Sequence, residues 1–269
     1  MLLALLFAQL QPLPPNLIAL DSNEGRKLFA ESTANRDFFA LVQTFEQQRS
    51  GPLCAAASSV AILNAMPLKA PEIPQLAPFR AFTQENVFEK AALDAIARGG
   101  ATMEQLASYL RSVGADARVV HASATSLDAF RAEAAKNMAS ADDYILIDFL
   151  RAELGQDFGA HWSPLAAYHA GSDRFLVLDV NRMRYPPYWA KAEDLFRSMN
   201  TNDPDAGASR GWLVVTPHPG APGRVEIPTV THKLFRLVAA AAFGIFALGA
   251  VAGGLFARWR IRRATPKAQ

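Results

Sequence analysis

The chain has 269 residues, of which 51% are apolar and 19% are charged. This composition provides enough apolar surface for a folded core and excludes a disordered or fibrous chain. The formal net charge is +2, and five of the 27 basic residues lie beyond position 257, so the remainder has a slight excess of acids. A nucleic-acid-binding protein normally has a basic body, so the sequence predicts no nucleic-acid partner.

The chain begins with an apolar segment over residues 1–15, MLLALLFAQLQPLPP. Residues 2–8 resemble the hydrophobic part of a secretory signal, although the usual positive charges before it are missing. The segment predicts export of the protein. An apolar arm packed on the folded domain is the alternative.

Helical patterns dominate the first half of the body, and short β-rich runs follow. Apolar residues recur three and four positions apart, or a small-residue run is present, over residues 24–30, 37–45, 54–64, 83–96, 103–113 and 126–138. Strands are predicted over residues 117–120, 144–149, 164–168, 175–180 and 212–216. This order predicts an α+β domain over residues 16–216, with the N-terminal helical part packed on an antiparallel sheet.

Three segments follow the predicted domain. Residues 217–236 are rich in Pro and Gly and predict a linker. Residues 237–257 carry no charge and are long enough for a C-terminal transmembrane helix, with a buried core helix as the alternative. The basic tail 258–269 predicts a cytoplasmic C-terminus, and hence a single-pass inner-membrane protein with a periplasmic body. Glycines within the predicted span favour a homodimer.

Cys54 is the only cysteine, which excludes an internal disulfide and a multi-cysteine zinc site. It follows a Gly51-Pro52 turn and begins a predicted helix, whose N-terminus favours the thiolate and lowers the pKa of a thiol. Gln48, six residues upstream, is suited to stabilise an oxyanion together with the Cys54 backbone N–H. A buried structural cysteine is the alternative.

A thiolate nucleophile needs a base and a group that orients the base. His161 opens one predicted strand, Asp179 ends the next, and a turn-like stretch lies midway between them. An antiparallel hairpin folded at this turn sets the two residues opposite each other, about 4.5–5.5 Å apart at Cβ. His169 lies too far along the strand to share the site and is predicted to be a turn or surface residue.

Arg182 follows Asp179 closely, and its guanidinium can bind a substrate carboxylate through two hydrogen bonds. A surface arginine in a polar loop is the alternative. One cysteine and scattered histidines do not make a metal site, so the sequence predicts no resident metal and no cofactor.

Several segments together resemble the phytochelatin synthases, which are papain-like thiol enzymes, in the short bacterial form that has only the catalytic domain. They span about residues 16–215 and include DFFALVQTFEQQRSGPLCAAASSVAILNA, PFRAFTQENVF, HWSPLAAYHAGSDRFLVLDVNRMRYPPYW and DLFRSMNT. The H-x-S-P-L and YPP-x-W pieces are far more specific than a triad alone. Ala55 is a departure, because the family typically has Gly directly after the nucleophile.

The resemblance implies a papain-like cysteine protease fold and glutathione gamma-glutamylcysteinyltransferase activity. It implies Cys54 as nucleophile, His161 as base, Asp179 as the group that orients the base, and Gln48 as the oxyanion donor. Cys54 would attack the Cys–Gly amide of glutathione, release glycine, and pass the γ-Glu-Cys acyl group to water or to a second glutathione. Heavy-metal ions would enter as thiolates of the substrate, which implies a role in metal detoxification.

Two other functions remain open from the sequence. A thiol peptidase would use the same three residues on other exported peptides. A non-catalytic module would bind thiol peptides or metal thiolates at the membrane without forming an acyl group on Cys54.

Overall fold

The computed structural model describes residues 11–219, except 142 and 158. The helices in this part of the chain are α1 Asn23–Glu31, α2 Arg36–Thr44, α3 Cys54–Ala65, α4 Lys90–Gly99, α5 Met103–Ser112, α6 Leu127–Asn137 and α7 Ala192–Met199. The strands are β1 Ile18–Ala19, β2 Ala115–His121, β3 Tyr144–Leu150, β4 Ala160–His169, β5 Arg174–Val177, β6 Tyr188–Lys191, β7 Asn202–Asp203, β8 Ala208–Ser209 and β9 Gly211–Pro217. The structure is therefore α+β, with most of the helices ahead of the strands.

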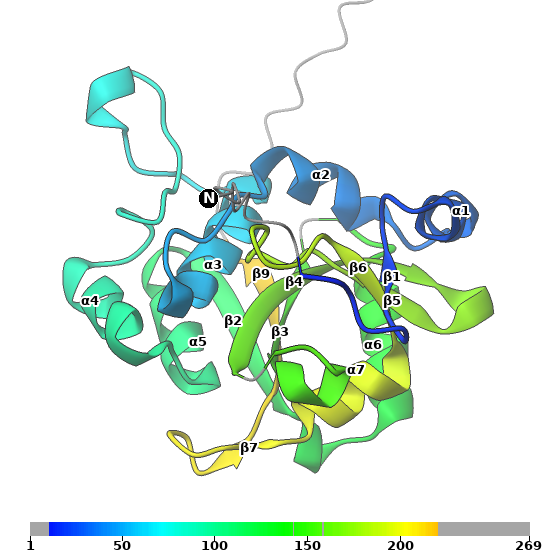
Figure 1. The fold of residues 1–269 in the computed structure, drawn as a ribbon. Coiled ribbons are helices and arrows are strands. Elements are labelled where there is room, and N and C mark those ends of the chain that lie inside the picture. The colour runs from blue at the N-terminus through cyan, green and yellow to red at the C-terminus, as the bar shows by residue number, and fades with distance from the viewer. Residues whose placement is uncertain (1–10, 142, 158, 220–269) are drawn as a thin grey trace, which may run out of the picture. The chain divides into compact units, whose positions relative to one another are not determined.

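Seven of the strands form one antiparallel sheet in the order β1-β6-β5-β4-β3-β9-β2, shown in Figure 1. The strands β3 and β4 lie near its middle and pair with Phe149 opposite His161. A short turn at Ala170–Ser172 leads from β4 into β5, and a bulge interrupts this pairing between Leu165 and Ala167. The predicted hairpin is therefore present, but β5 ends at Val177, before Asp179.

The two faces of the sheet bury two separate apolar clusters. Along β3, Tyr144 and Leu146 belong to the cluster that includes α3, α4 and α5, whereas Ile147 and Phe149 belong to the cluster that includes α6 and α7. Side chains alternate between the faces because successive residues of a strand point in opposite directions. The strand is apolar on both faces because helices cover both, and Asp148 breaks this pattern on the α3 side.

The helix α3 begins at Cys54 and is buried around its whole circumference, since all its residues except Asn64 are buried. Its Ala and Ser side chains are small and allow close approach to the sheet. The Ser58 hydroxyl donates a hydrogen bond of 3.0 Å to the backbone carbonyl of Trp162 in β4. This contact holds the start of α3 against the strand that carries His161.

One part of the predicted fold is wrong. Within residues 11–141, 143–157 and 159–219, no helix is long and apolar enough to cross a bilayer. The longest helix of these ranges, α3, has 12 residues and spans about 18 Å, whereas a hydrocarbon core is about 30 Å thick. The described residues therefore give no support to the transmembrane helix or the single-pass inner-membrane location predicted from the sequence, and the predicted span, residues 237–257, lies outside them.

Several predicted segments lie outside the described residues. These are residues 1–10 of the signal-like segment, residues 220–236 of the linker, the apolar run 237–257 and the tail 258–269. Residues 11–15, the part of the signal-like segment that the structure describes, pack on the domain. The backbone N–H of Gln11 donates to the carbonyl of Arg184 at 2.7 Å, and Leu13 packs against the cluster on the α6 side.

The substitution Phe130→Ala is expected to lower the free energy of unfolding by about 3–5 kcal/mol, because it leaves a cavity in the core. The Phe130 ring is fully buried and lies 5.1 Å from the Phe175 ring and 4.9 Å from the Trp212 ring, between centroids. Urea unfolding measures the change. In the control Phe79→Ala, where the side chain is 71% exposed, the loss should stay within about 0.5 kcal/mol. Equal losses in the two variants would contradict the assigned core.

Candidate active site

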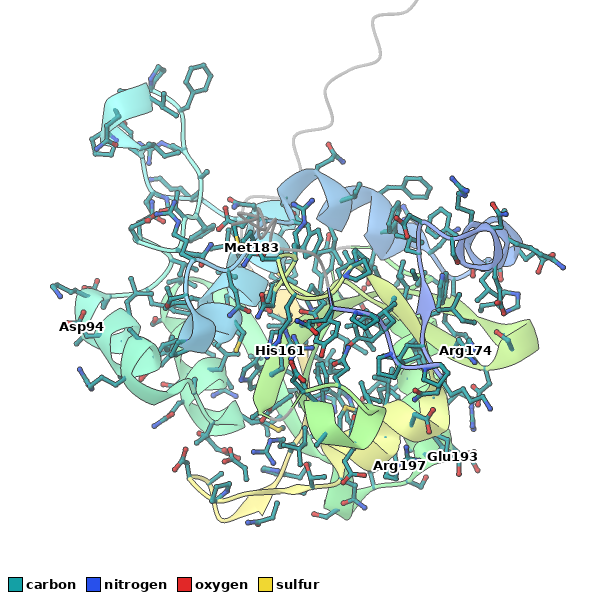
Figure 2. All side chains as sticks on the ribbon, in the orientation of Figure 1. Asp94, His161, Arg174, Met183, Glu193 and Arg197 are labelled. Atoms are coloured by element: carbon teal, nitrogen blue, oxygen red, sulfur yellow. The ribbon has the colours of Figure 1, made fainter. Side chains whose placement is uncertain are left out.

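His161 and Asp179 meet in the interior of the described residues. The imidazole Nε2 lies 2.9 Å from Oδ1 of the carboxylate, and the two side chains are 4% and 0% exposed. Figure 2 shows His161 in the interior, whereas Asp94 and Arg197 lie at the periphery. The predicted base and its orienting carboxylate are therefore brought together.

The backbone fixes both partners. His161 stands in β4, where it pairs with Phe149 of β3, and the two rings contact edge to face at 5.6 Å between centroids. Asp179 lies in the irregular segment after β5, where its Oδ1 also accepts from the backbone N–H of Asn181 at 2.9 Å. The pair therefore depends on this turn after β5 and not on a cross-strand register.

Arg151 is a further partner of Asp179 that the sequence analysis missed. Its Nη2 donates to Oδ1 at 2.8 Å, and its Nη1 lies 2.8 Å from Oδ2. The available signal was an arginine directly after a strand that is apolar except for Asp148, in the segment LIDFLRAEL. A charge in that place is rarely buried unless it has a partner.

The pKa values of the pair follow from burial and these charges. Burial alone would raise the pKa of Asp179, but the charges and hydrogen bonds of His161 and Arg151 outweigh it and hold this pKa below its usual range. Burial lowers the pKa of His161, and the Arg151 cation lowers it further against the opposing effect of Asp179. At neutral pH the site therefore holds an ionised Asp179 beside a neutral imidazole.

Cys54 begins α3 as predicted, but its burial opposes the thiolate that the helix terminus favours. The side chain is buried, and burial raises the pKa of the thiol to about 11, an effect to which the charge of Asp148 adds. The backbone N–H groups of Trp162 and Ala55 lower this pKa, but by less than burial raises it. Desolvation therefore exceeds the effect of the helix terminus, and the resting thiol is protonated.

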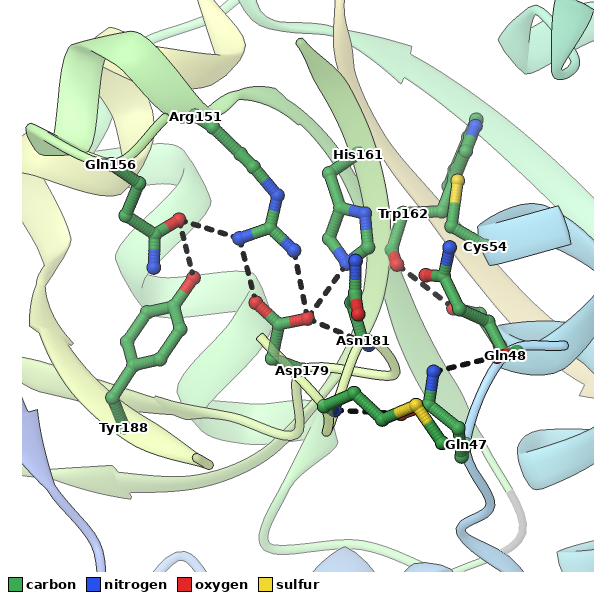
Figure 3. Close-up of polar contacts among 12 residues, drawn as sticks. Gln47, Gln48, Cys54, Arg151, Gln156, His161, Trp162, Asp179, Asn181 and Tyr188 are labelled. Carbon is green, nitrogen blue, oxygen red and sulfur yellow. Dashed lines mark hydrogen bonds and ion pairs between the residues drawn. The ribbon is translucent and has the colours of Figure 1, made fainter. Parts of the chain in front are cut away.

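Cys54 lies on the other side of His161 from Asp179 in Figure 3. Asp179 takes Nε2 of the imidazole, which leaves Nδ1 without a hydrogen bond among the described residues. The same residues show no hydrogen bond or ion pair between Cys54 and His161, and the acceptor recorded for the thiol is the Pro52 carbonyl at 4.0 Å. Such bonds commonly tighten only when substrate is bound.

Gln48 lies close to Cys54 in Figure 3, but its amide hydrogens point elsewhere. Its Nε2 donates to the backbone carbonyls of Ser50 and Gly51, both at 2.8 Å. Its Oε1 is buried and has no hydrogen-bond partner among the described residues. Donation from Gln48 to an oxyanion therefore requires the amide to give up one of these bonds.

The loop before Cys54 is held by a glutamine to which the sequence analysis gave no role. Gln84 is buried, and its Oε1 accepts from the backbone N–H of Arg49 at 3.0 Å. Its Nε2 donates to the carbonyl of Gln47 at 3.0 Å and to Glu46 at 2.7 Å. This single side chain therefore ties together the backbone on both sides of Gln48.

Arg182 and His169 lie away from the pair. Arg182 is exposed, and its guanidinium stacks over the Phe45 ring at 4.9 Å from the centroid. His169 stands at the turn after β4, as predicted, but it is buried there and its Nδ1 accepts from the backbone N–H of Ser172. Substrate binding by Arg182 stays a prediction.

A cavity of about 470 Å³ lies beside the thiol. Cys54 lines it together with Ala160 and Trp162, the two chain neighbours of His161. The charged residues on its wall are Arg98, Asp148, Asp203, Asp205 and Arg210. The cavity therefore presents both cationic and anionic groups next to the thiol.

Asp148 and Arg210 form an incompletely paired couple on this wall. Both are buried, and Nε of Arg210 lies 3.7 Å from Oδ1 of Asp148, too far for a hydrogen bond. Neither atom has another hydrogen-bond partner among the described residues. Burial raises the pKa of Asp148 to about 8, against the charge of Arg210. Two buried polar groups are therefore open to a ligand.

The comparison with known proteins decides the family. The sequence profile "Phytochelatin synthase" matches residues 8–212, which include Gln48, Cys54, His161 and Asp179. The chain belongs to the phytochelatin synthase family. The resemblance predicted from the sequence is confirmed.

Relatives of this phytochelatin synthase domain carry the name of an enzyme. The chain is 31% identical over 242 residues to glutathione gamma-glutamylcysteinyltransferase 1 of Lotus japonicus, which covers 89% of this chain and 48% of the relative. It is 30% identical to the protein of that name from Triticum aestivum (88% and 47% covered) and 25% identical to glutathione gamma-glutamylcysteinyltransferase of Schizosaccharomyces pombe (76% and 50%). The chain spans about half the length of the relatives it matches.

The described part of the chain contains no cluster of side chains that could bind a metal ion. Residues 11–219, except 142 and 158, contain no group of three or more His, Cys, Asp or Glu side chains that could hold an ion.

Alkylation of Cys54 by iodoacetamide is expected to be about 10²-fold slower at pH 7 than that of a free cysteine peptide, because its thiol pKa is raised to about 11. The rate should rise with pH up to about that value. Mass spectrometry measures the reaction at one defined site, since the chain has one cysteine. Labelling that reaches its plateau by pH 7 would show a preformed thiolate and contradict the assigned burial.

Proposed function

We propose that this protein is a thiol-dependent acyltransferase that acts on glutathione. The observation that supports this function best is the buried His161–Asp179 pair next to a charged cavity that Cys54 lines. The family and the name of its relatives agree with this chemistry. The reaction needs a nucleophile, a base and an orienting carboxylate, and the three residues supply these types.

The reaction proceeds through a thioester on Cys54. As Sγ attacks the carbonyl carbon of the Cys–Gly amide, its proton passes to Nδ1 of His161, the ring nitrogen that Asp179 leaves open. The imidazolium then gives this proton to the glycine nitrogen, the C–N bond breaks, and glycine leaves. Water or the amine of a second glutathione then attacks the thioester carbon and gives its proton to His161. The C–S bond breaks, the γ-Glu-Cys product leaves, and the imidazolium returns the proton to Sγ, which restores the thiol.

The neutral resting pair determines when the proton moves. Burial keeps the thiol of Cys54 protonated and the imidazole of His161 neutral. The nucleophile is therefore generated during the attack and not before it. During this step Asp179, which stays ionised, stabilises the imidazolium that forms.

The charges of the cavity match the ends of glutathione. Its glutamyl end carries an ammonium and a carboxylate on one carbon. Asp148 and Asp203 are acceptors for the ammonium, and Arg98 and Arg210 are donors for a carboxylate. This pattern favours a γ-glutamyl peptide, because an α-linked peptide does not carry a free ammonium and a free carboxylate on the same carbon. A heavy-metal ion would enter bound to the substrate thiolate.

The two remaining predicted site residues keep secondary roles in this proposal. Gln48 can assist the Cys54 backbone N–H at the oxyanion only after its amide turns from the Ser50 and Gly51 carbonyls. Arg182 would have to leave the Phe45 ring to reach a substrate carboxylate.

The substitutions Cys54→Ala and His161→Gln are each expected to lower the rate of glycine release from glutathione by at least about 10³-fold, because each removes a group that takes part in bond making or proton transfer. Glycine is measured by amino-acid analysis. The control is His218→Gln, which changes an exposed histidine and should keep the wild-type rate. Full activity in Cys54→Ala would eliminate the proposed mechanism.

Mass spectrometry of the wild-type reaction separates the alternatives. An increase in the mass of Cys54 by one γ-Glu-Cys acyl group supports the transferase. Binding of glutathione without product or acyl group would indicate the non-catalytic module. Turnover of unrelated peptides but not of glutathione would indicate a general thiol peptidase.

Above about pH 8, where the Asp148 carboxyl is ionised, the substitution Asp148→Asn is expected to weaken glutathione binding about 10-fold to 100-fold, because the ammonium loses a charged acceptor. Isothermal titration calorimetry on the inactive Cys54→Ala protein measures Kd without turnover. With Asp148 intact, binding should strengthen as pH rises through about 8, where this carboxyl ionises, and the variant should lose this dependence. Asp94→Asn, on the exposed face of α4, is the matched control. An unchanged Kd in Asp148→Asn would remove this subsite.

A further inference from the structure

Arg151 makes more contacts with the Asp179 carboxylate than His161 does. Its two terminal nitrogens lie 2.8 Å from Oδ1 and 2.8 Å from Oδ2, whereas His161 contacts Oδ1 alone. The contact to Oδ1 is a hydrogen bond, and the contact to Oδ2, which has no hydrogen-bond partner among the described residues, is an ion-pair contact. Two contacts on the two oxygens restrain the plane of the carboxylate as well as its position. The orientation that Asp179 presents to the imidazole therefore depends on Arg151; Figure 3 shows its contacts with both carboxylate oxygens.

The guanidinium is itself held from three directions. Its Nη1 donates to Oε1 of Gln156 at 2.7 Å, and its Cζ lies 5.1 Å from the centroid of the Tyr185 ring and 5.8 Å from that of Phe149. The Phe149 ring also contacts His161, so one aromatic side chain touches both partners of Asp179. The cation is therefore fixed before any substrate arrives.

Backbone hydrogen bonds hold the segment that carries Arg151. The N–H of Arg151 donates to the carbonyl of Gly159 at 3.0 Å, and the N–H of Gln156 donates to the carbonyl of Arg151 at 3.2 Å. The turn Arg151–Leu154 therefore starts beside Gly159, which lies one residue before β4 and two before His161. The Arg151 side chain therefore extends to Asp179 from a backbone position that hydrogen bonds hold in place.

We infer that Arg151 is a positioning residue of the proposed reaction: its fork on Asp179 aligns the carboxylate with Nε2 of His161 and keeps Nδ1 directed toward the thiol. This inference rests on the proposed acyl transfer. It adds a fourth residue to the site, one that touches neither the substrate nor the reacting atoms.

The same contacts set the charge state of the imidazole. The charged groups around His161 are Asp179, Arg151 and Arg184, and both arginines lower its pKa. With Arg151 in place, its positive charge already balances the negative charge of Asp179. Protonation of His161, which adds a second positive charge, is therefore stabilised less by the carboxylate. Without Arg151, the buried carboxylate would retain His161 as its cationic partner, and the imidazole would take up a proton more readily.

The test compares Arg151→Lys and Arg151→Met with matched variants of Arg131, which also forks onto an aspartate, Asp173, at 2.8 Å and 2.8 Å, away from the site. The first measurement is the pH dependence of kcat/KM for glycine release from glutathione. The second is the NMR titration of the His161 ring proton, assigned by its absence in His161→Gln.

In Arg151→Met, kcat/KM at pH 7 should fall on the order of 10²-fold, because the base is misplaced. The acid limb of the pH dependence of kcat/KM and the midpoint of the His161 NMR titration should both shift to higher pH by about one unit. In Arg151→Lys, the charge remains and the fork is lost, so the limb should stay near that of the wild type while kcat falls about tenfold. Neither limb nor rate should change in the Arg131 variants.

The inference is overturned if folded Arg151→Met keeps the wild-type acid limb and His161 titration. If Arg151→Met does not fold, a wild-type kcat in Arg151→Lys overturns it instead. Failure of the proposed function has a different signature, because the wild type itself would then release no glycine. The His161 titration does not depend on turnover and decides the role of Arg151 in that case as well.

Discussion

A carboxylate with no access to solvent is the constraint around which this site is organised. Asp179 is fully buried, and an isolated buried charge is strongly unfavourable. It is tolerated because Arg151, His161 and the Asn181 backbone N–H all point at it. These partners come from three separate segments, so the carboxylate also serves as the point at which β3, β4 and the turn after β5 are joined.

Burial also explains the chemical state of the nucleophile. Cys54 starts a helix, a place where a thiolate is usually favoured, yet its burial desolvates the thiol, and the charge of Asp148 raises the pKa of the thiol further. The structure thus gives a protonated thiol beside a neutral imidazole. In such a site the attack and the proton transfer are coupled, which makes the placement of the imidazole important for the rate.

The sheet provides the rigidity that this placement needs. The central strands β3 and β4 carry groups of the site on both faces, with Asp148 on the α3 side and Phe149 on the other. The small residues of α3 allow it to lie directly on β4. The thiol, the base and the charged wall of the cavity therefore come from adjacent, mutually packed elements rather than from independent loops.

The sequence alone determined the order of helices and strands, the start of α3 at Cys54, the family, and the encounter of His161 with Asp179. The order of elements and the start of α3 follow from local periodicity and turn residues, and the family follows from the resemblance of several segments. The encounter was expected from the chain distance between the two residues, although the turn after β5, and not a cross-strand register, brings Asp179 to His161. The tertiary structure decided what depends on burial and on contacts between distant segments. The two contacts of Arg151 with Asp179, the incompletely paired Asp148 and Arg210 in the cavity wall, and the raised thiol pKa arise only when the chain is packed. Desolvation and charges from distant segments have no signature in a linear pattern.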